Sequence, residues 1–419
     1  MSAETVREQT RCCVVGGGPG GMVLAYLLAG TGVDVTLLEM HGDFDREFRG
    51  DTFHSPSTRL MADVGLLDRL DAITHAKVRK LSMYTEAGNF VMLDATRLAI
   101  PFPWIGLVPQ HEFLGMLAEE GQRRFPNLRI VLEATARELI EEDGTVRGVV
   151  YRQHGQTREL RADLVVGADG RTSRIRRLAG LELVTSSPPM DVLWFRLPHE
   201  PGDDEAVGGI AFFIHRGKFL IWIPRGDYWQ VGYVILKGSL DEIKASGIET
   251  LHRDVERLVP RFGARIRTVA DWKDVAVLAV QSGRVERWHR PGLLLIGDAA
   301  HVMSPVGGVG INYAIMDAIA AANVLAEPLR AGRVEGADLA LVQKRRESST
   351  RFIQGIQEGI QRRIVGAALR SDAPFQPPLP MRLLPHVPIL RDLPALALTR
   401  GLRAERLRPA LRRTIRARG

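Results

Sequence analysis

The stretch RCCVVGGGPGGMVLAYLLAGTGVDVTLLEM, residues 11–40, decides the fold. It reads as an apolar strand ending at Val15, a glycine turn, a helix over residues 19–31 and a second apolar strand over residues 33–39. This order is typical of a βαβ unit, in which the two strands are parallel. Glycine destabilises the interior of helices and strands. A cluster of glycines between residues 16 and 21 therefore indicates a bound ligand or close backbone packing.

Three of these glycines, Gly16, Gly18 and Gly21, fit the pattern G-x-G-x-x-G, and Glu39 ends the second strand. In a dinucleotide-binding unit the first glycine forms the turn, the second admits a pyrophosphate to the backbone, and the third lets helix and strand pack closely. The positive end of the helix dipole would hold the phosphate oxygens, and Glu39 would accept hydrogen bonds from the ribose hydroxyls. The alternative is a purely structural turn, but strand, helix and distal acid together favour nucleotide binding.

Two later segments also show an apolar strand that ends beside an acid and a glycine. They are DLVVGADGRTSRIRR, residues 163–177, and GLLLIGDAAHVMSPVGGVGINYAIMDAIAAANVL, residues 292–325. Parallel strands deliver polar groups at their carboxyl ends, which share one edge of the sheet. One such motif alone could be an ordinary strand-to-helix turn. Three in this order favour a parallel sheet that binds a dinucleotide.

Together these segments resemble the single-component flavoprotein aromatic hydroxylases related to 4-hydroxybenzoate hydroxylase and the ubiquinone-biosynthesis hydroxylases. The resemblance covers Gly16 to Glu39, Asp169 to Arg176 and Gly297 to Asp317, and elsewhere it extends only to the layout. Many relatives have proline and glycine where this chain has Ser304 and Ala314. The resemblance implies FAD as cofactor, NAD(P)H as a transient co-substrate without a fold of its own, and hydroxylation by O2 through a C4a-hydroperoxyflavin. The implied substrate is a small apolar aromatic, polycyclic, polyketide-like or isoprenoid-like molecule.

Length and resemblance predict an α/β fold of intimately joined domains, because 419 residues exceed the roughly 250–300 residues of a single core. We expect a Rossmann-like FAD-binding domain with a parallel sheet, an antiparallel β-sheet substrate domain and an arginine-rich C-terminal helical region. The expected ranges are 1–75, 105–180 and 280–345 for the first domain, 76–104 and 181–279 for the second, and 346–419 for the third.

The resemblance also assigns cofactor contacts beyond the glycine turn. Asp298, next to Gly297, resembles the aspartate that bonds the ribityl chain of the flavin. Asp169 and Gly170 resemble the pair that lies near the pyrophosphate and the path of NAD(P)H.

Arg49, in REFRGDTF, resembles an arginine that contacts the cofactor, and Gln110, in LVPQHEF, resembles a glutamine or arginine that does so. A structural role at the surface is the alternative for both. His54 is a weak candidate for a base that deprotonates a phenol, and no general base is assigned. For His301 we favour a structural hydrogen bond.

The stretch PVGGVGIN, residues 305–312, is the expected environment of the flavin ring. Pro305 would end an extended segment, and Gly307 and Gly308 would bring bare backbone against the isoalloxazine. A helix beginning near residue 309 would direct its amides at the pyrimidine end of the ring and stabilise the negative charge of reduced flavin. Further cofactor contacts are expected at the start of that helix, from Gly310, Ile311 and Asn312.

Residues 190–236 contain the alternating stretches GIAFFIH, KFLIWIP and DYWQVGYVI, which predict antiparallel hairpins. In the family such a sheet roofs the substrate cavity. An apolar aromatic substrate needs flat apolar walls, so aromatic residues are the expected lining. Alternation does not show which face looks inward, and ordinary core packing is the alternative for each candidate. The candidates are Phe212, Phe213, Trp222 and Tyr233.

Composition bears on several other function classes. The chain is 45% hydrophobic and 25% charged, as expected for a globular protein. Cys12 and Cys13 are adjacent and point to opposite faces of a strand, so we expect buried thiols and no disulfide between them. The first ten residues lack the apolar core of a secretory signal, so we expect a cytoplasmic protein. Without C-x-x-C, H-E-x-x-H or phosphate-loop motifs, we expect no metal site and no nucleotide hydrolysis.

The net charge of +7 belongs to the carboxyl-terminal tail. Lys344 to Gly419 contains 17 basic and 5 acidic residues, which leaves the rest of the chain net acidic. No aromatic residues interleave with a basic stripe, so nucleic-acid binding is not expected. We expect an arm packed along the body. The alternative is peripheral contact with an anionic membrane or a partner.

Three other functions stay open at the level of sequence. A reductase of isoprenoid double bonds, similar to the geranylgeranyl reductases, would use the same flavin framework. A halogenase is less supported, because IWIP around Trp222 is only a fragment of W-x-W-x-I-P. A noncatalytic flavin-binding subunit would use the arginine-rich tail to hold a partner.

Overall fold

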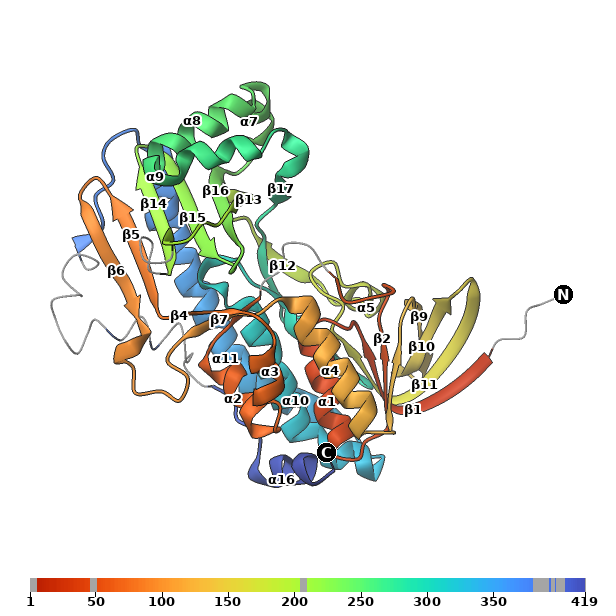
Figure 1. Cartoon of the computed structure of the whole chain (residues 1–419). Helices are drawn as coiled ribbons and strands as arrows, with labels where there is room; N and C mark the ends of the chain where they lie inside the picture. Colours follow the sequence, from red (N-terminus) through yellow and green to blue (C-terminus); the bar gives the residue numbers. More distant parts are fainter. Residues whose placement is uncertain are drawn as a thin grey trace.

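Two large β-sheets, one mostly parallel and one mostly antiparallel, organise the chain (Figure 1). The computed structural model describes residues 6–45, 51–203, 209–379, 392, 396 and 404–418. The predicted α/β fold, with a parallel nucleotide-binding sheet and a separate antiparallel sheet, is confirmed.

The first sheet grows from the βαβ unit. Strand β1 (Val6–Val15) pairs in parallel with β2 (Val35–Leu38) and β11 (Gln156–Gly167), and β11 pairs in parallel with β20 (Leu293–Leu295). The strand order is β19-β20-β11-β1-β2-β8. From β1 the chain adds β2 and β8 on one side of the sheet and then β11 and β20 on the other, so the order of strand addition reverses between β1 and β11. Such a switch point is where open α/β sheets bind ligands. The other strands are β8 (Leu128–Val131), β9 (Thr135–Glu142), β10 (Thr145–Gln153) and β19 (His289–Arg290).

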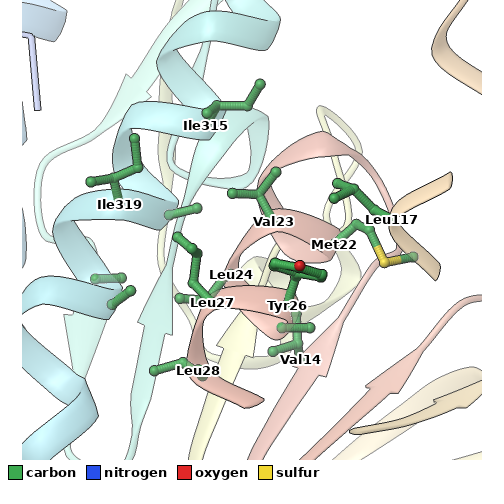
Figure 2. Packing of buried hydrophobic residues seen from close by; sticks show 14 of the residues in the cluster. Val14, Met22, Val23, Leu24, Tyr26, Leu27, Leu28, Leu117, Ile315 and Ile319 are labelled. Atoms are coloured by element: carbon green, nitrogen blue, oxygen red, sulfur yellow. The ribbon is translucent and has the colours of Figure 1, made fainter. Parts of the chain in front are cut away.

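One face of the first sheet packs against α1 (Pro19–Gly30), α4 (Gln110–Arg124) and α10 (Gly310–Ala331). Figure 2 shows the centre of this core, where α1 lies between β1 and α10 and meets Leu117 of α4. Helix α10 is long and apolar enough to cross a membrane, but 94% of its most apolar window is buried inside the fold. We therefore regard α10 as a core helix.

Cys12 and Cys13 lie on opposite faces of β1, as predicted, and both are buried free thiols. Cys12 belongs to the core under α1, whereas Cys13 packs into the core on the other face of the sheet.

The second sheet, which we call the roof sheet, has the strand order β17-β13-β16-β15-β14-β5-β6. The predicted hairpins are confirmed, because β14 pairs antiparallel with β15 and β15 with β16. The bounds are β5 (Lys80–Thr85), β6 (Gly88–Asp94), β13 (Met190–Pro198), β14 (Ile210–His215), β15 (Lys218–Pro224), β16 (Tyr228–Leu236) and β17 (Ala276–Leu278).

The two faces of the roof sheet have different neighbours. One face packs under α7 (Leu240–Ala245), α8 (Ile248–Leu258) and α9 (Pro260–Gly263). The opposite face, which we call the inner face, packs with Val306 and Ile360 in one apolar cluster. Its members include Val192, Trp194, Phe212, Phe219, Ile221 and Ile223.

Two small sheets cross the predicted domain boundaries. One has the order β3-β7-β4, from β3 (Thr52–Phe53), β7 (Ile105–Leu107) and β4 (Ala76–Val78). The other has the order β12-β18-β21, from β12 (Leu183–Ser186), β18 (Ser282–Val285) and β21 (His301–Val302). Strands β4 and β12, which the prediction gave to the substrate domain, therefore pair with strands that it gave to the FAD-binding domain.

The boundary expected between residues 345 and 346 falls inside a helix. Helix α11 (Gly336–Ile360) passes through it without interruption and continues as a π-helical turn, η6 (Gln361–Val365), and α12 (Gly366–Arg370). The other helices are α2 (Ser55–Asp63), α3 (Leu67–Ala72), α5 (Arg174–Leu178) and α16 (Pro409–Ala417), with 3-10 turns η1 (Ala95–Arg97), η2 (Ala264–Thr268), η3 (Trp272–Asp274), η4 (Gly297–Ala299) and η5 (Val306–Gly308).

The last helix, α16, packs along the body. Ile415 is fully buried, and it lies where a side chain at Gly30 of α1 would have to go. Arg416 donates hydrogen bonds to the backbone carbonyls of Ala62 and Asp63. This part of the tail is therefore an arm held against the molecule. Contact of the tail with a membrane or partner stays a prediction.

Candidate active site

The carboxyl ends of four parallel strands bring the predicted motifs together. Val15 is in register with Leu38 and with Gly167, and Gly167 is in register with Leu295. The residues that follow these strand ends therefore emerge at one edge of the sheet, on both sides of the switch point. They are Gly16, Glu39, Ala168 to Gly170, and Ile296 to Asp298.

The glycines of the glycine turn serve both close backbone packing and ligand binding. A side chain at Gly16, whose φ is +108°, would overlap the carbonyl oxygen of Ala168, and one at Gly21 would overlap that of Gly16. At Gly18, the N-cap of α1, no atom of the described residues lies within 4 Å of the place where a Cβ would be. Gly16 and Gly21 thus allow close packing, and Gly18 leaves bare backbone open at a helix N-terminus. This arrangement fits a dinucleotide pyrophosphate.

Glu39 lies beside the glycine turn with only 6% of its surface exposed. Its Oε2 accepts a hydrogen bond of 2.8 Å from the backbone N–H of Gly17. Its Oε1 accepts from the backbone N–H of His41 at 3.0 Å and lies 2.6 Å from His41 Nδ1. The carboxylate is therefore fixed at the end of β2, where the ribose of a dinucleotide is expected.

The carboxylate of Asp169 holds its own loop. It accepts hydrogen bonds from Ser173 Oγ at 2.5 Å and from the backbone N–H groups of Arg174 and Ile175 at 2.7 and 3.0 Å. The neighbouring Gly170 has φ of +81° and no described atom within 4 Å of its Cβ position. Asp169 shapes the loop, and Gly170 is the residue that leaves room for a ligand.

The turn that carries Asp298 is set by a buried carboxylate on α10. Gly297 has φ of +58°, and its N–H donates to Asp317 Oδ2 at 3.0 Å. Asp317 also lies 2.5 Å from His301 Nε2 and accepts from Arg346 Nε at 2.8 Å. Burial alone would raise the pKa of Asp317, but His301 and Arg346 outweigh it and lower that pKa. The structural role expected for His301 is what this geometry shows.

Sequence reasoning did not identify Asp317 or Arg346 as part of the site. Both are at most 1% exposed, on α10 and α11 respectively. An aspartate inside the apolar run of α10 was the available signal, since a buried charge needs a partner. Arg346 gave no signal, because arginine is common throughout the tail.

The turn Pro305 to Gly308, which we call the ring loop, is half-buried at the same edge. Gly307 and Gly308 have φ of +81° and +60°. A Cβ at Gly308 would lie 2.8 Å from Thr52 Oγ1, so the ring loop approaches the segment before α2 closely. Helix α10 begins at Gly310, one residue after the predicted start.

The side chain of Asn312 is used within the protein, so a cofactor contact through its amide is not supported. Its Oδ1 accepts from the backbone N–H of His54 at 2.9 Å and from Ser57 Oγ at 2.7 Å. Its Nδ2 donates to the carbonyl oxygen of Thr52 at 2.7 Å. Asn312 therefore joins the first turn of α10 to the segment 52–57. Ile311, predicted as a cofactor contact, is only 7% exposed and belongs to the core under α1.

Three other predicted residues stay predictions. His54 is 2% exposed and precedes α2 as its N-cap residue. Gln110 is half-buried at the start of α4. Arg49 lies outside the described residues.

The two departures from the family pattern have structural counterparts. The side chain of Ala314 faces Gly20 and Gly297, and a Cβ at either glycine would come within 3.2 Å of it. Ser304 is 1% exposed, and its Oγ accepts hydrogen bonds from the Val306 N–H at 3.2 Å and from Gln361 Nε2. The serine thus forms polar contacts that proline would not.

Three of the four substrate candidates lie on the face of the roof sheet that is covered by helices, away from the ring loop. Trp222, Tyr233 and Phe213 pack under α8 and α9, and the Tyr233 hydroxyl donates to Asp254 Oδ2 at 2.6 Å. Phe212 lies on the inner face, in the cluster that includes Val306 of the ring loop. The period of two groups residues by face, but the helices after β16 decide which face is covered.

The described residues contain no group of three or more histidines, cysteines, aspartates or glutamates that could hold a metal ion. The site consists of glycine backbone with N–H donors, carboxylate acceptors and apolar side chains. These groups suit a dinucleotide such as FAD.

Comparison with known proteins supports this interpretation. A family model described as an FAD binding domain matches residues 9–355. Over 394 residues the chain is 33% identical to 6-methylpretetramide 4-monooxygenase of Streptomyces rimosus, with 92% of this chain and 91% of that protein covered. It is 29% identical to digeranylgeranylglycerophospholipid reductase of Methanothrix thermoacetophila, with 80% and 82% covered. The crystal structure of p-nitrophenol 4-monooxygenase from Pseudomonas putida DLL-E4 matches with a TM-score of 0.75 at 20% identity, over 94% of this chain and 100% of that chain.

The glycine turn, the carboxyl edge of the sheet and the family match agree on the cofactor. NAD(P)H is the typical co-substrate of this family. The chain belongs to the FAD-binding-domain family and is an FAD-dependent monooxygenase.

Proposed function

We propose that this enzyme hydroxylates a polycyclic aromatic, polyketide-type substrate at the expense of NAD(P)H and O2. The observation that carries the proposal is the 33% identity, over 92% of the chain, to a protein named as the 4-monooxygenase of 6-methylpretetramide. The inner face of the roof sheet supports it, because Phe212, Ile221 and Ile223 are half-buried there in one cluster with Val306. Such a surface suits a flat apolar molecule.

Several of the predicted contacts would be available to FAD. Gly18 and Gly170 would offer open backbone to the pyrophosphate, Glu39 would accept hydrogen bonds from the ribose, and Asp298 would bond the ribityl chain. The ring loop and the first turn of α10 would present N–H groups to the flavin ring. When bound, FAD supplies electron transfer from NAD(P)H and the activation of O2.

Besides binding an apolar substrate, the inner face would exclude water from the reacting atoms. Phe219 and Trp194, deeper in the same cluster, are at most 8% exposed. A dry site strengthens the electrostatic effect of the ring-loop amides on reduced flavin. His54 stays the candidate base.

The test uses the full chain loaded with FAD, with NAD(P)H and 6-methylpretetramide as the probe substrate, under ¹⁸O₂. We expect substrate-dependent NAD(P)H oxidation and a product that contains one atom of ¹⁸O. The 29% identity to a lipid reductase is the reason for testing a second function. Reduction of a double bond in an isoprenoid lipid, without oxygen uptake, would favour that reductase function. Asp298→Ala is the control and should lose FAD while it keeps its fold.

A further inference from the structure

Three buried glutamines lie along one side of the helix that connects the two sheets. Gln354 and Gln357 belong to α11, and Gln361 begins η6. Their spacing of three and four residues places them on one helical face. They are 7%, 2% and 3% exposed, respectively. Buried amides are unfavourable unless they are hydrogen-bonded, so this row requires partners.

All three side chains donate to the segment that contains the ring loop. Gln354 Nε2 donates to the carbonyl oxygens of Gly283 and Val302 at 2.9 and 3.2 Å. Gln361 Nε2 donates to Ser304 Oγ. The acceptors at 302 and 304 flank Pro305 on its amino-terminal side.

Gln357 makes the central contact, because its amide spans Pro305. Its Nε2 donates to the carbonyl oxygens of Ser304 and Val306 at 2.9 and 2.7 Å. Both partners are acceptors only, which fixes the orientation of the amide.

The ring loop cannot satisfy these carbonyl groups by itself. Pro305 has no N–H, and the positive φ of Gly307 interrupts the short turn η5, so η5 does not continue as a regular helix. A buried carbonyl without a donor destabilises the conformation that contains it. The glutamine row supplies these donors from a rigid helix.

The same helical segment also contacts the roof sheet. Ile360, Ile364 and Val365 belong to the inner-face cluster with Val306. The π-helical turn at Gln361–Val365 lies between the glutamine row and α12, and such turns frequently mark functional sites. In Figure 1, α11 passes beside α10 and its continuation reaches the roof sheet. One continuous element therefore holds the ring loop and packs against the expected substrate wall.

We propose that Gln357, supported by Gln361 through Ser304, is a positioning residue for the flavin ring. It holds the ring loop in the position from which its backbone N–H groups stabilise the negative charge of reduced flavin. This proposal rests on the proposed flavin site. It also gives a purpose to Ser304, whose hydroxyl is the acceptor for Gln361.

The test compares Gln357→Glu and Gln357→Met with Gln343→Glu as a matched control. Glutamate has the shape of glutamine but places an acceptor against two carbonyls, and methionine removes the donor altogether. Gln343 lies on the same helix, where its Nε2 donates to the carbonyl oxygen of Glu286 at 2.7 Å, away from the ring loop. The readouts are the thermal midpoint, the FAD dissociation constant from flavin fluorescence and the midpoint potential of the bound flavin.

We expect both Gln357 variants to bind FAD with about a tenfold weaker preference for the reduced form. For a two-electron couple this is a midpoint potential about 30 mV more negative. Gln343→Glu should lower the thermal midpoint without moving the potential. Ser304→Ala, the milder variant if a Gln357 variant does not fold, should shift the potential in the same direction by less.

Unchanged potentials and FAD affinities in folded Gln357 and Ser304 variants would overturn this proposal while the flavin site of the parent enzyme stands. A parent chain that does not bind FAD would overturn the proposed function as well. An equal shift of the flavin midpoint potential in Gln343→Glu would overturn it too. It would show that any destabilisation of α11 changes the potential, and that the contacts of Gln357 are not specifically responsible.

Discussion

Arg225, directly after β15, and Asp51, just before β3, form a largely buried ion pair that links the roof sheet to the small sheet β3-β7-β4. The Arg225 side chain is 8% exposed, and its Nη2 donates to Asp51 Oδ1 at 2.9 Å. Arg225 Nε also donates to Gln230 Oε1 at 2.8 Å. Burial raises the pKa of Asp51, although Arg225 acts against that rise. The pair therefore fixes Asp51, directly before the segment 52–57 that Asn312 contacts.

Removing the cation should destabilise the enzyme strongly. We expect Arg225→Met to lower the free energy of unfolding by about 3–5 kcal/mol, because it leaves the Asp51 carboxylate buried and unpaired. The double variant Arg225→Met/Asp51→Leu should recover much of that loss, since no lone charge remains. Urea denaturation of the parent, the two single variants and the double variant measures this. Additive losses would show that the two side chains act independently.

Two glycines of the same turn should respond differently to alanine. Gly18 has ordinary φ and ψ of −69° and 178° and open space at its Cβ position. Gly18→Ala should therefore change the free energy of unfolding by less than about 0.5 kcal/mol, yet weaken FAD binding at least about tenfold, because the methyl group takes the place of a phosphate. Gly21→Ala should lose about 1–3 kcal/mol, because its methyl group would overlap the Gly16 carbonyl oxygen.

Fluorescence titration with FAD and thermal melting of the FAD-free variants separate these effects. Equal loss of stability in both variants would mean that Gly18 is also a packing glycine.

Phe212 and Phe213 are neighbours on opposite faces of β14 and provide a matched pair. Phe212→Ala should raise the KM for the aromatic substrate, because it removes part of the inner face beside Val306. Phe213→Ala should reduce stability by about 2–4 kcal/mol with little change in KM, because Phe213 stacks on Tyr84 at 4.9 Å in the core under α8. Steady-state kinetics and thermal melting of the two variants test this. A KM effect confined to Phe213→Ala would reverse our assignment of the faces.

The stability of the enzyme should fall in alkali, partly because of Cys13. Burial raises the pKa of this thiol from 9.0 to about 12. The folded chain thus holds the thiol proton more tightly than the unfolded chain does. The stabilisation is complete below pH 9 and is lost as the pH rises from 9 toward 12.

Cys13→Ala should therefore show a shallower decline in unfolding free energy across this range, by up to about 1.4 kcal/mol per pH unit. Urea denaturation of parent and variant on both sides of pH 9 gives the comparison. Parallel pH profiles would argue that the thiol does not ionise on unfolding in this range.

Local pattern was sufficient to predict the nucleotide-binding edge. The strand before Gly16, the acid at Glu39 and the Asp169 and Asp298 motifs are each short in sequence, and the geometry of a parallel sheet brings strand ends together. The faces of the roof sheet could not be predicted in this way. Trp222 is assigned to the covered face only by helices that follow some twenty residues later in the chain.

Long-range packing explains the other differences. The boundary at residue 345 was placed where basic residues become frequent, but the helical period of α11 does not change there. From the sequence alone, the polar residues Gln354, Gln357 and Gln361 would be expected on a solvent-exposed face of the helix. Only the position of the ring loop, some fifty residues earlier, makes them buried donors.

The packing of α16 against α1 affects how the chain can fold while it is synthesised on the ribosome. Helix α1 is made long before α16, so Phe125 covers part of the surface at Gly30 first, and Ile415 covers the rest only after α16 has been synthesised. Strand β20, which pairs with β11 on one side of the first sheet, is likewise made long after β1 and β2. A nascent chain therefore carries exposed apolar surface through most of its translation. We therefore expect loss of α16 to lower the yield of folded enzyme.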